Sequence, residues 1–134
     1  MLERSDPGQL NQLLKSLECN AQVPSHLQDL FSRRGVIEPT FDERRRFVRR
    51  HFPSKVVLEL SQTVPGVSRD HKFYCVLTKD MSRNSIAILH SEQLYPGERL
   101  LLWLPIGKLR CQVSRCRRHN SQCFETCAMF CCTD

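Results

Sequence analysis

The residues best suited to chemistry in this chain are arginines gathered in one short run. Arginine occupies five of the seven positions from 44 to 50. A guanidinium group is a planar fork of donors, and it pairs through two parallel hydrogen bonds with phosphate oxygens or with the N7 and O6 acceptors of guanine. The run therefore favours a planar, anionic partner.

A second polar group follows in the stretch Asp80-Met-Ser-Arg-Asn-Ser85. An ionised carboxylate accepts hydrogen bonds, whereas a hydroxyl such as that of Ser82 both donates and accepts. Asp80 would complement the arginines, because a carboxylate can accept the N1 and N2 protons of guanine. For these residues taken alone, the alternative is a plain turn in which Asp80 caps its own backbone.

The overall composition agrees with an anionic partner and excludes several functions. The formal net charge is +6, and 15 of the 20 basic residues are arginine, although a basic surface that only maintains solubility explains the charge equally well. The chain lacks a Gly-x-Ser-x-Gly elbow, a phosphate loop and a His-Glu-x-x-His motif, so we expect a binding module and no enzyme. It also lacks a long apolar segment and a signal peptide, so we expect a cytoplasmic protein without a membrane partner.

Helical spacing dominates residues 1–40. Asp6-Pro7 predicts a helix start, and the leucines after it share one face: Leu10, Leu13, Leu14 and Leu17. Ser25, three residues before Gln28, predicts a capping box at the start of a second helix. This α-helical N-terminal extension would cover the main domain, or dock a partner or a second copy.

Residues 41–134 have the pattern of a β domain. Six apolar segments alternate with turn-forming residues, at 54–62, 71–79, 84–90, 98–105, 109–118 and 122–132. No helical stretch between them is long enough for a parallel crossover, which favours antiparallel pairing closed into a barrel. The predicted fold class is mainly β, a six-stranded antiparallel barrel with a helical N-terminal extension.

The order of these features resembles the PilZ family. That family combines an Arg-x-x-x-Arg motif, just before the first barrel strand, with Asp/Asn-x-Ser-x-x-Gly between its second and third strands. Here Arg45-Arg-Phe-Val-Arg49 and Asp80-Met-Ser-Arg-Asn-Ser85 occupy those places, and the likeness covers residues 42–132. The two motifs together, in a six-strand pattern, make a more specific signal than either alone.

The resemblance implies a bacterial receptor for the second messenger cyclic di-GMP, with a PilZ-like barrel. The ligand-binding residues that it implies are Arg44, Arg45, Arg49, Asp80, Ser82 and Ser85. Arg44 stands where relatives with arginine tend to take an intercalated ligand dimer. Ligand binding would order the arginine segment against the barrel and change how the protein presents itself to a downstream protein partner, which the sequence does not identify.

The register of the arginine motif has an alternative. Arg46 and Arg50 have the same spacing as Arg45 and Arg49. We prefer the earlier pair because Glu43-Arg44 precedes it, as the family pattern expects. At least two of the five arginines are expected to face water only.

Ser85 departs from the family pattern, which has glycine at this position. If the turn needs a positive φ there, serine adds strain of about 1 kcal/mol or more and weakens ligand binding. This departure favours the first of two rival functions, a PilZ-like protein-interaction scaffold that has lost the nucleotide. The second rival is a basic nucleic-acid-binding barrel, which we do not expect because only ten residues are aromatic and stacking platforms are therefore few.

Eight cysteines without an export signal predict reduced thiols. Pairing of the last two predicted strands places Cys111 on the core face, and Cys116, Cys123 and Cys127 on the opposite face. These three thiols and His119 form a possible zinc site. The Cys-x3-Cys spacing is unusual for zinc, so we expect cysteines that act as small hydrophobic residues, with no metal and no cofactor.

Overall fold

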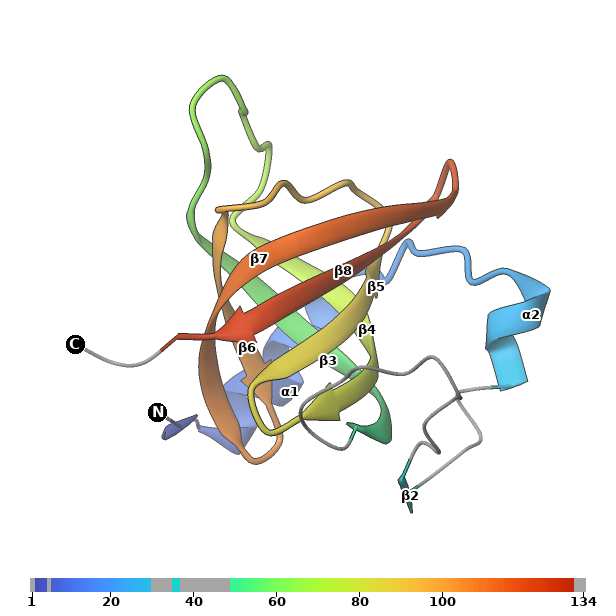
Figure 1. Ribbon diagram of the computed structural model, residues 1–134. Coiled ribbons are helices and arrows are strands. Elements are labelled where there is room, and N and C mark those ends of the chain that lie inside the picture. The colour runs from blue at the N-terminus through green and yellow to red at the C-terminus, as the bar shows by residue number, and fades with distance from the viewer. Residues whose placement is uncertain (1, 5, 30–34, 37–48, 132–134) are drawn as a thin grey trace.

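Six long strands close into an antiparallel barrel in the computed structural model, which describes residues 2–4, 6–29, 35–36 and 49–131 (Figure 1). The barrel strands are β3 (Arg49–Gln62), β4 (Phe73–Ser82), β5 (Ser85–His90), β6 (Arg99–Leu104), β7 (Gly107–Asn120) and β8 (Cys123–Phe130). Each pairs with two neighbours in the ring β3–β4–β5–β8–β7–β6. Two short strands, β1 (Leu2–Glu3) and β2 (Gly35–Val36), pair with β7 and β3. The predicted fold class is confirmed.

The interior of the barrel is filled by every second residue of the strands, as alternation predicts. Val56 and Leu58 of β3, Ile86 and Ile88 of β5 and Leu102 of β6 are fully buried in one cluster. Such a core excludes a central channel, so a ligand as large as a dinucleotide has to bind on the outer surface.

The first barrel strand begins earlier than the sequence predicts. The expected start is residue 54, but β3 begins five residues earlier, at Arg49. Its pairing with β4 extends to this first residue, where Arg49 lies opposite Ser82. The residues gained, 49–53, include two arginines and Pro53, which do not favour a strand. Pairing with the end of β4 holds them in the sheet, and Arg49 therefore belongs to the barrel and not to a linker.

A β-bulge in β4 decides which way Asp80 faces. Thr78 pairs with Ile88 of β5, yet Asp80 pairs with the next residue, Ala87, so that Lys79 is an extra residue in β4. The extra residue reverses the alternation. Thr78 is on the interior side with Ile88, and Asp80 is on the outer side with Ala87.

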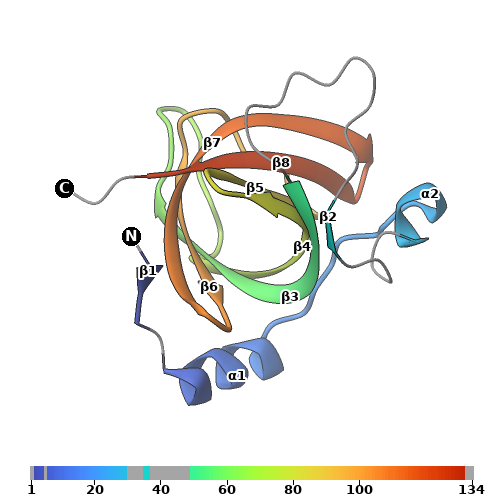
Figure 2. The ribbon, with the colours of Figure 1, turned by 60° about the horizontal axis from the view of Figure 1, so that its bottom comes forward.

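The helix α1 (Pro7–Ser16) confirms the first helical prediction. The Asp6 carboxylate caps it by accepting a 2.9 Å hydrogen bond from the backbone N–H of Gly8. Leu10 packs on Val57 and Trp103, so the helix covers the outer face of β3 and β6 (Figure 2). Among the described residues, no helix has the length and apolar character needed to cross a membrane.

The second helix, α2 (Ser25–Gln28), is a single turn. The predicted capping box is wrong, because the capping residue is Pro24 and no side chain caps this helix. The Gln28 amide donates to the carbonyl of Val23 at 3.2 Å instead. Burial of Leu27 against Leu89 therefore holds this turn in place.

Candidate functional site

A buried ion pair joins the two motifs that the sequence singled out. Arg49, the first residue of β3, donates from Nε to Asp80 Oδ1 at 2.6 Å, and its Nη2 contacts the same oxygen. The two side chains are only 8% and 4% exposed. A carboxylate and a guanidinium so far removed from water need each other, because either group alone would lose its solvation without compensation.

Two serine hydroxyls extend this pair into a network over three strands. Arg49 Nη1 donates to Ser85 Oγ at 2.7 Å, and Ser85 Oγ lies 2.9 Å from Ser82 Oγ. Ser82 also donates to Asn84 Oδ1 at 3.1 Å, within the β4–β5 turn. The second motif thus supplies one carboxylate and two hydroxyls around a single guanidinium.

The strain expected at Ser85 is absent. Over the described ranges no residue other than glycine has a positive φ, and Ser85 simply begins β5. The condition for strain, a positive φ at this position, is therefore not met. Its hydroxyl instead gives Arg49 an acceptor that glycine would not provide.

Four of the six predicted ligand-binding residues meet here: Arg49, Asp80, Ser82 and Ser85. Arg44 and Arg45 lie outside the described residues, so their positions relative to this network stay predictions. Of the alternative pair, Arg46 also lies outside them, and Arg50 is exposed opposite Met81. The plain-turn alternative for Asp80 does not fit, because its carboxylate is bound to Arg49 from another strand.

Sequence reasoning missed two neighbours of Asp80. Lys79 Nζ lies 3.4 Å from Asp80 Oδ2. His51 pairs with Asp80 across β3 and β4, and its Nδ1 is buried without a hydrogen-bond partner among the described residues. In a regular strand, consecutive residues such as Lys79 and Asp80 point to opposite faces. The β4 bulge breaks this alternation, and Lys79 Nζ can therefore lie beside the Asp80 carboxylate.

Lys79 connects the site to a second carboxylate. Its Nζ lies 3.1 Å from Glu125 Oε2 on β8, and His119 Nε2 lies 2.8 Å from Glu125 Oε1. Burial disfavours the charged form of Glu125, but the hydrogen bonds from His119 and Lys79, with the charges of Lys79 and Arg117, keep its pKa below the usual value. A charged strip therefore runs from Arg49 across the outer face to β7.

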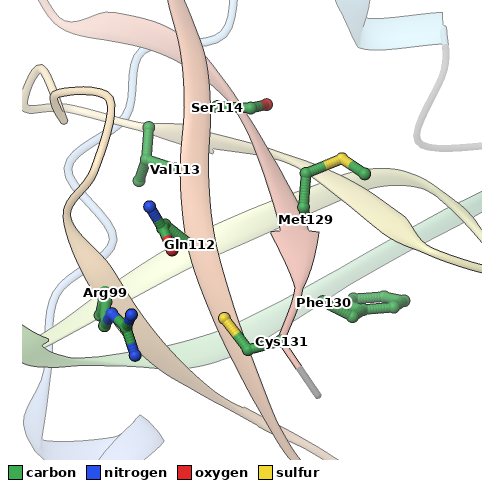
Figure 3. A pocket seen from close by; sticks show the side chains of 7 residues that line it. All are labelled: Arg99, Gln112, Val113, Ser114, Met129, Phe130 and Cys131. Carbon is green, nitrogen blue, oxygen red and sulfur yellow. The ribbon is translucent and has the colours of Figure 1, made fainter.

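A shallow pocket of about 460 Å³ begins one strand away from this network, since its residue Met129 pairs with Ser85 across β5 and β8. Figure 3 shows Arg99 and Gln112 on one side of β7, and Met129 and Phe130 on the other. Met129 is 40% exposed. The pocket thus offers a guanidinium, an amide and an apolar thioether beside the candidate site.

The cysteines do not assemble the possible zinc site. Within the part of the chain that the structure describes, no three metal-ligating side chains converge. Cys123 is buried against Leu27, and Cys116 Sγ lies 3.5 Å from the Thr126 hydroxyl. The fourth candidate ligand, His119, is engaged by Glu125.

The relation of the chain to known proteins was tested by sequence. No protein-family model matches it, and no curated protein matches it.

Proposed function

We propose that this protein is a bacterial receptor for cyclic di-GMP, which binds on the outer face of the barrel around Arg49, Asp80, Ser82 and Ser85. The observation that carries the proposal is the direct hydrogen bonding of Arg49 to Asp80 and Ser85. These residues come from the two motifs that resemble the PilZ family and are 31 and 36 positions apart in the chain. A barrel could have kept them on separate faces.

The ligand has the right groups to replace each partner in this network. Guanine donates from N1 and N2, so its edge can take the place of the Arg49 guanidinium on the Asp80 carboxylate. Arg49 is then free to bind a phosphodiester or the N7 and O6 atoms of the second guanine. Each buried charge keeps a hydrogen-bonding partner, so the exchange avoids the free-energy cost of leaving a buried charge unpaired.

Further cations would assist the binding of a ligand with two negative charges. In this proposal Arg44 and Arg45 close over the ligand, and Arg44 favours an intercalated ligand dimer. Lys79 Nζ lies 3.4 Å from Asp80 Oδ2. It balances the negative charge of Asp80 when Arg49 turns from Asp80 to the ligand. The pocket around Met129 provides an adjoining apolar surface for a purine ring.

The proposed output is mechanical and not catalytic. Ligand binding fixes the arginine segment that precedes β3 against the barrel, which changes the surface shown to a downstream protein. The ligand acts as a signal, so no cofactor and no enzyme activity are part of the proposal. We place the protein in the bacterial cytoplasm, where such a messenger is made and read.

One observation favours the rival function of a protein-interaction scaffold without a ligand. Arg49 and Asp80 already satisfy each other, and both are nearly excluded from water. A pair of this kind also stabilises a barrel that binds no nucleotide. The two functions differ in a single measurable property, which is the affinity for cyclic di-GMP.

Isothermal titration calorimetry with cyclic di-GMP separates these functions. We expect a micromolar or lower Kd for the wild type, and Kd values at least about tenfold higher for Arg45→Ala, Arg49→Ala and Asp80→Ala, because each removes a charge-assisted hydrogen bond. The matched control is Arg118→Ala, an exposed arginine of β7, for which we expect no change beyond about twofold.

Two outcomes would contradict the proposal. A wild type that shows no heat of binding at 100-fold molar excess of cyclic di-GMP supports the scaffold. Binding of a single-stranded oligonucleotide with a steep salt dependence, equally weakened by Arg118→Ala, supports a nucleic-acid-binding barrel.

A further inference from the structure

The segment between α1 and α2 crosses the outer face of β4. At its start Leu17 packs against the same apolar cluster as Phe73, and near its end Val23 packs against the same cluster as Leu77. Cys75 lies between Phe73 and Leu77 on that face of β4, opposite Val57 of β3, which is itself covered by α1. The segment that joins α1 to α2 runs past β4 (Figure 2). Its middle therefore passes near Cys75, and residue 19, in that middle, is also a cysteine.

The segment is held at both ends. At its start the Leu17 N–H donates to the Leu13 carbonyl at 3.0 Å and so closes α1, which itself packs on the barrel. The Gln22 N–H donates to the Gln122 carbonyl at 2.9 Å, and the Asn120 amide donates to the Gln22 carbonyl at 3.0 Å. The segment is thereby held over β4, so the approach of Cys19 to Cys75 does not depend on a chance motion.

The two thiols influence each other's ionisation. The thiol of Cys75, which is 3% exposed, is the largest influence that lowers the pKa of Cys19 to about 7; burial opposes it, and the Ala21 backbone and the Lys55 charge assist it. The neighbouring Cys19, together with burial, raises the pKa of Cys75. Cys19 is therefore the thiolate and the nucleophile of the pair.

We propose that Cys19 and Cys75 are a redox pair, in which a hydroperoxide converts the two thiols into a disulfide that ties the N-terminal segment to the barrel. The assignment stands independently of cyclic di-GMP binding. It rests on the path of the segment across β4, which brings the half-buried thiol of Cys19 to the buried thiol of Cys75.

The reaction proceeds in two balanced steps. The Cys19 thiolate attacks the terminal peroxide oxygen, the O–O bond breaks, and the leaving oxygen takes up a proton as water or an alcohol, which leaves a sulfenic acid on Cys19. The Cys75 sulfur then attacks the Cys19 sulfur, the S–O bond breaks, and hydroxide leaves with the Cys75 proton as water. Two thiols have lost two electrons in all, and the peroxide has gained them.

Other cysteines are poorly suited to this chemistry. Burial, together with Cys131, raises the pKa of Cys111 to about 12. Burial also raises the pKa of Cys123, with a smaller contribution from Glu125. Thiols with raised pKa values hold little thiolate at neutral pH, so oxidation is expected to begin at Cys19.

The experiment is peptide mapping of the full-length protein after treatment with stoichiometric hydrogen peroxide. Remaining thiols are alkylated, and trypsin then releases Cys19 within residues 16–33 and Cys75 within residues 73–79, each as the single cysteine of its peptide. We expect these two peptides joined by a disulfide, in at least about tenfold excess over any other linked pair. The oxidised protein should also melt about 5 °C or more above the reduced one, because the bond closes a long loop of the unfolded chain.

Two variants complete the test. Cys19→Ser should remove both the linked peptides and the rise in Tm, whereas the matched control Cys127→Ser, another half-buried cysteine, should leave both unchanged. Linkage of Cys19 to a different cysteine, oxidation of Cys19 to sulfinic acid without linkage, or linkage with an unchanged Tm in the wild type would each overturn the proposal.

Discussion

The barrel contains two buried guanidinium–carboxylate pairs, at opposite ends of β3. Arg49 and Asp80 meet where β3 begins, and Arg69 and Glu98 meet beyond the point where it ends. Their side-chain exposures are similar, 8% and 4% for the first pair and 11% and 0% for the second. By burial alone the two pairs would be given the same role.

The second pair is fixed by the backbone. The Tyr95 N–H donates to Glu98 Oε1 at 2.8 Å, and Arg69 contacts both carboxylate oxygens. The backbone of Glu98 bonds to Tyr95 and Val113 in turn, through a turn in which Gly97 has a φ of 98°. Removing the carboxylate would leave the Tyr95 N–H unpaired, and it would leave Arg69 with only the more exposed Glu92, whose Oε1 lies 3.5 Å from Arg69 Nη1.

The first pair is held by side chains. Asp80 engages Arg49 and Lys79, and Arg49 engages Asp80 and Ser85. Side chains change rotamer without disturbing the strands, so their hydrogen bonds can pass to a ligand with matching donors and acceptors. The two pairs are similarly buried and differ in their partners: backbone groups fix the structural pair, whereas only side chains hold the exchangeable one.

The largest expected effect is on the structural pair. Glu98→Gln should lower the free energy of unfolding by about 3 kcal/mol, because it removes the buried counterion of Arg69 and leaves only Glu92, which is 43% exposed. Urea denaturation of the variant and the wild type measures this loss. A double variant, Arg69→Met with Glu98→Leu, should recover most of it. A loss for Glu98→Gln no larger than that for Asp80→Asn would mean that this pair is as exchangeable as the first.

The second effect is a pH dependence that belongs to the Arg69 end of the barrel. His90 is 2% exposed, and both of its ring nitrogens lack partners among the described residues. Burial, assisted by the charge of Arg69, lowers its pKa from 6.5 to about 4. Below pH 6.5, His90 binds a proton in the unfolded chain but stays neutral in the folded protein. The free energy of unfolding therefore falls by about 3 kcal/mol as the pH drops towards 4.

The variant His90→Leu isolates this contribution. Its stability should fall less steeply than that of the wild type between pH 6.5 and pH 4, as measured by denaturant unfolding at each pH. Equal slopes for the two proteins would show that His90 does not titrate with a lowered pKa.

The third effect tests the exchangeable pair with the same chemical change as the first. Asp80→Asn should cost less, about 2 kcal/mol of stability, because Arg49 keeps Ser85 as an acceptor and lies at the first residue of β3, although it loses its buried counterion. The same change should raise the Kd for cyclic di-GMP at least about tenfold. A stability loss as large as that of Glu98→Gln would erase the distinction between the pairs.

The smallest expected effect concerns Ser85. Ser85→Gly removes an acceptor of Arg49 and should lower stability by less than about 1 kcal/mol, while the freed guanidinium binds cyclic di-GMP a few-fold more tightly. Calorimetry on this variant, with Ser85→Thr as the control that keeps the hydroxyl, checks the affinity. An unchanged Kd would show that Ser85 does not compete with the ligand for Arg49.

Much of the barrel was predictable from local pattern. Alternating apolar residues predicted all six barrel strands in their observed order, and Asp6-Pro7 predicted the start of α1. These features depend on neighbours within a few residues, where alternation and capping act. The capping box at Ser25 failed because burial of Leu27 positions α2 instead of a local hydrogen bond.

The amino-acid sequence by itself determined which groups are available: an arginine run, a carboxylate with two serine hydroxyls, six strands to carry them and cysteines at positions 19 and 75. The tertiary structure alone decided that Arg49 and not Arg50 faces Asp80, that the bulge at Lys79 turns Asp80 outward, and that Cys19 lies over Cys75. The physical reason is that the facing of a strand residue follows from its register with distant strands. That register is set by hydrogen bonds between segments far apart in the chain, which no local spacing records.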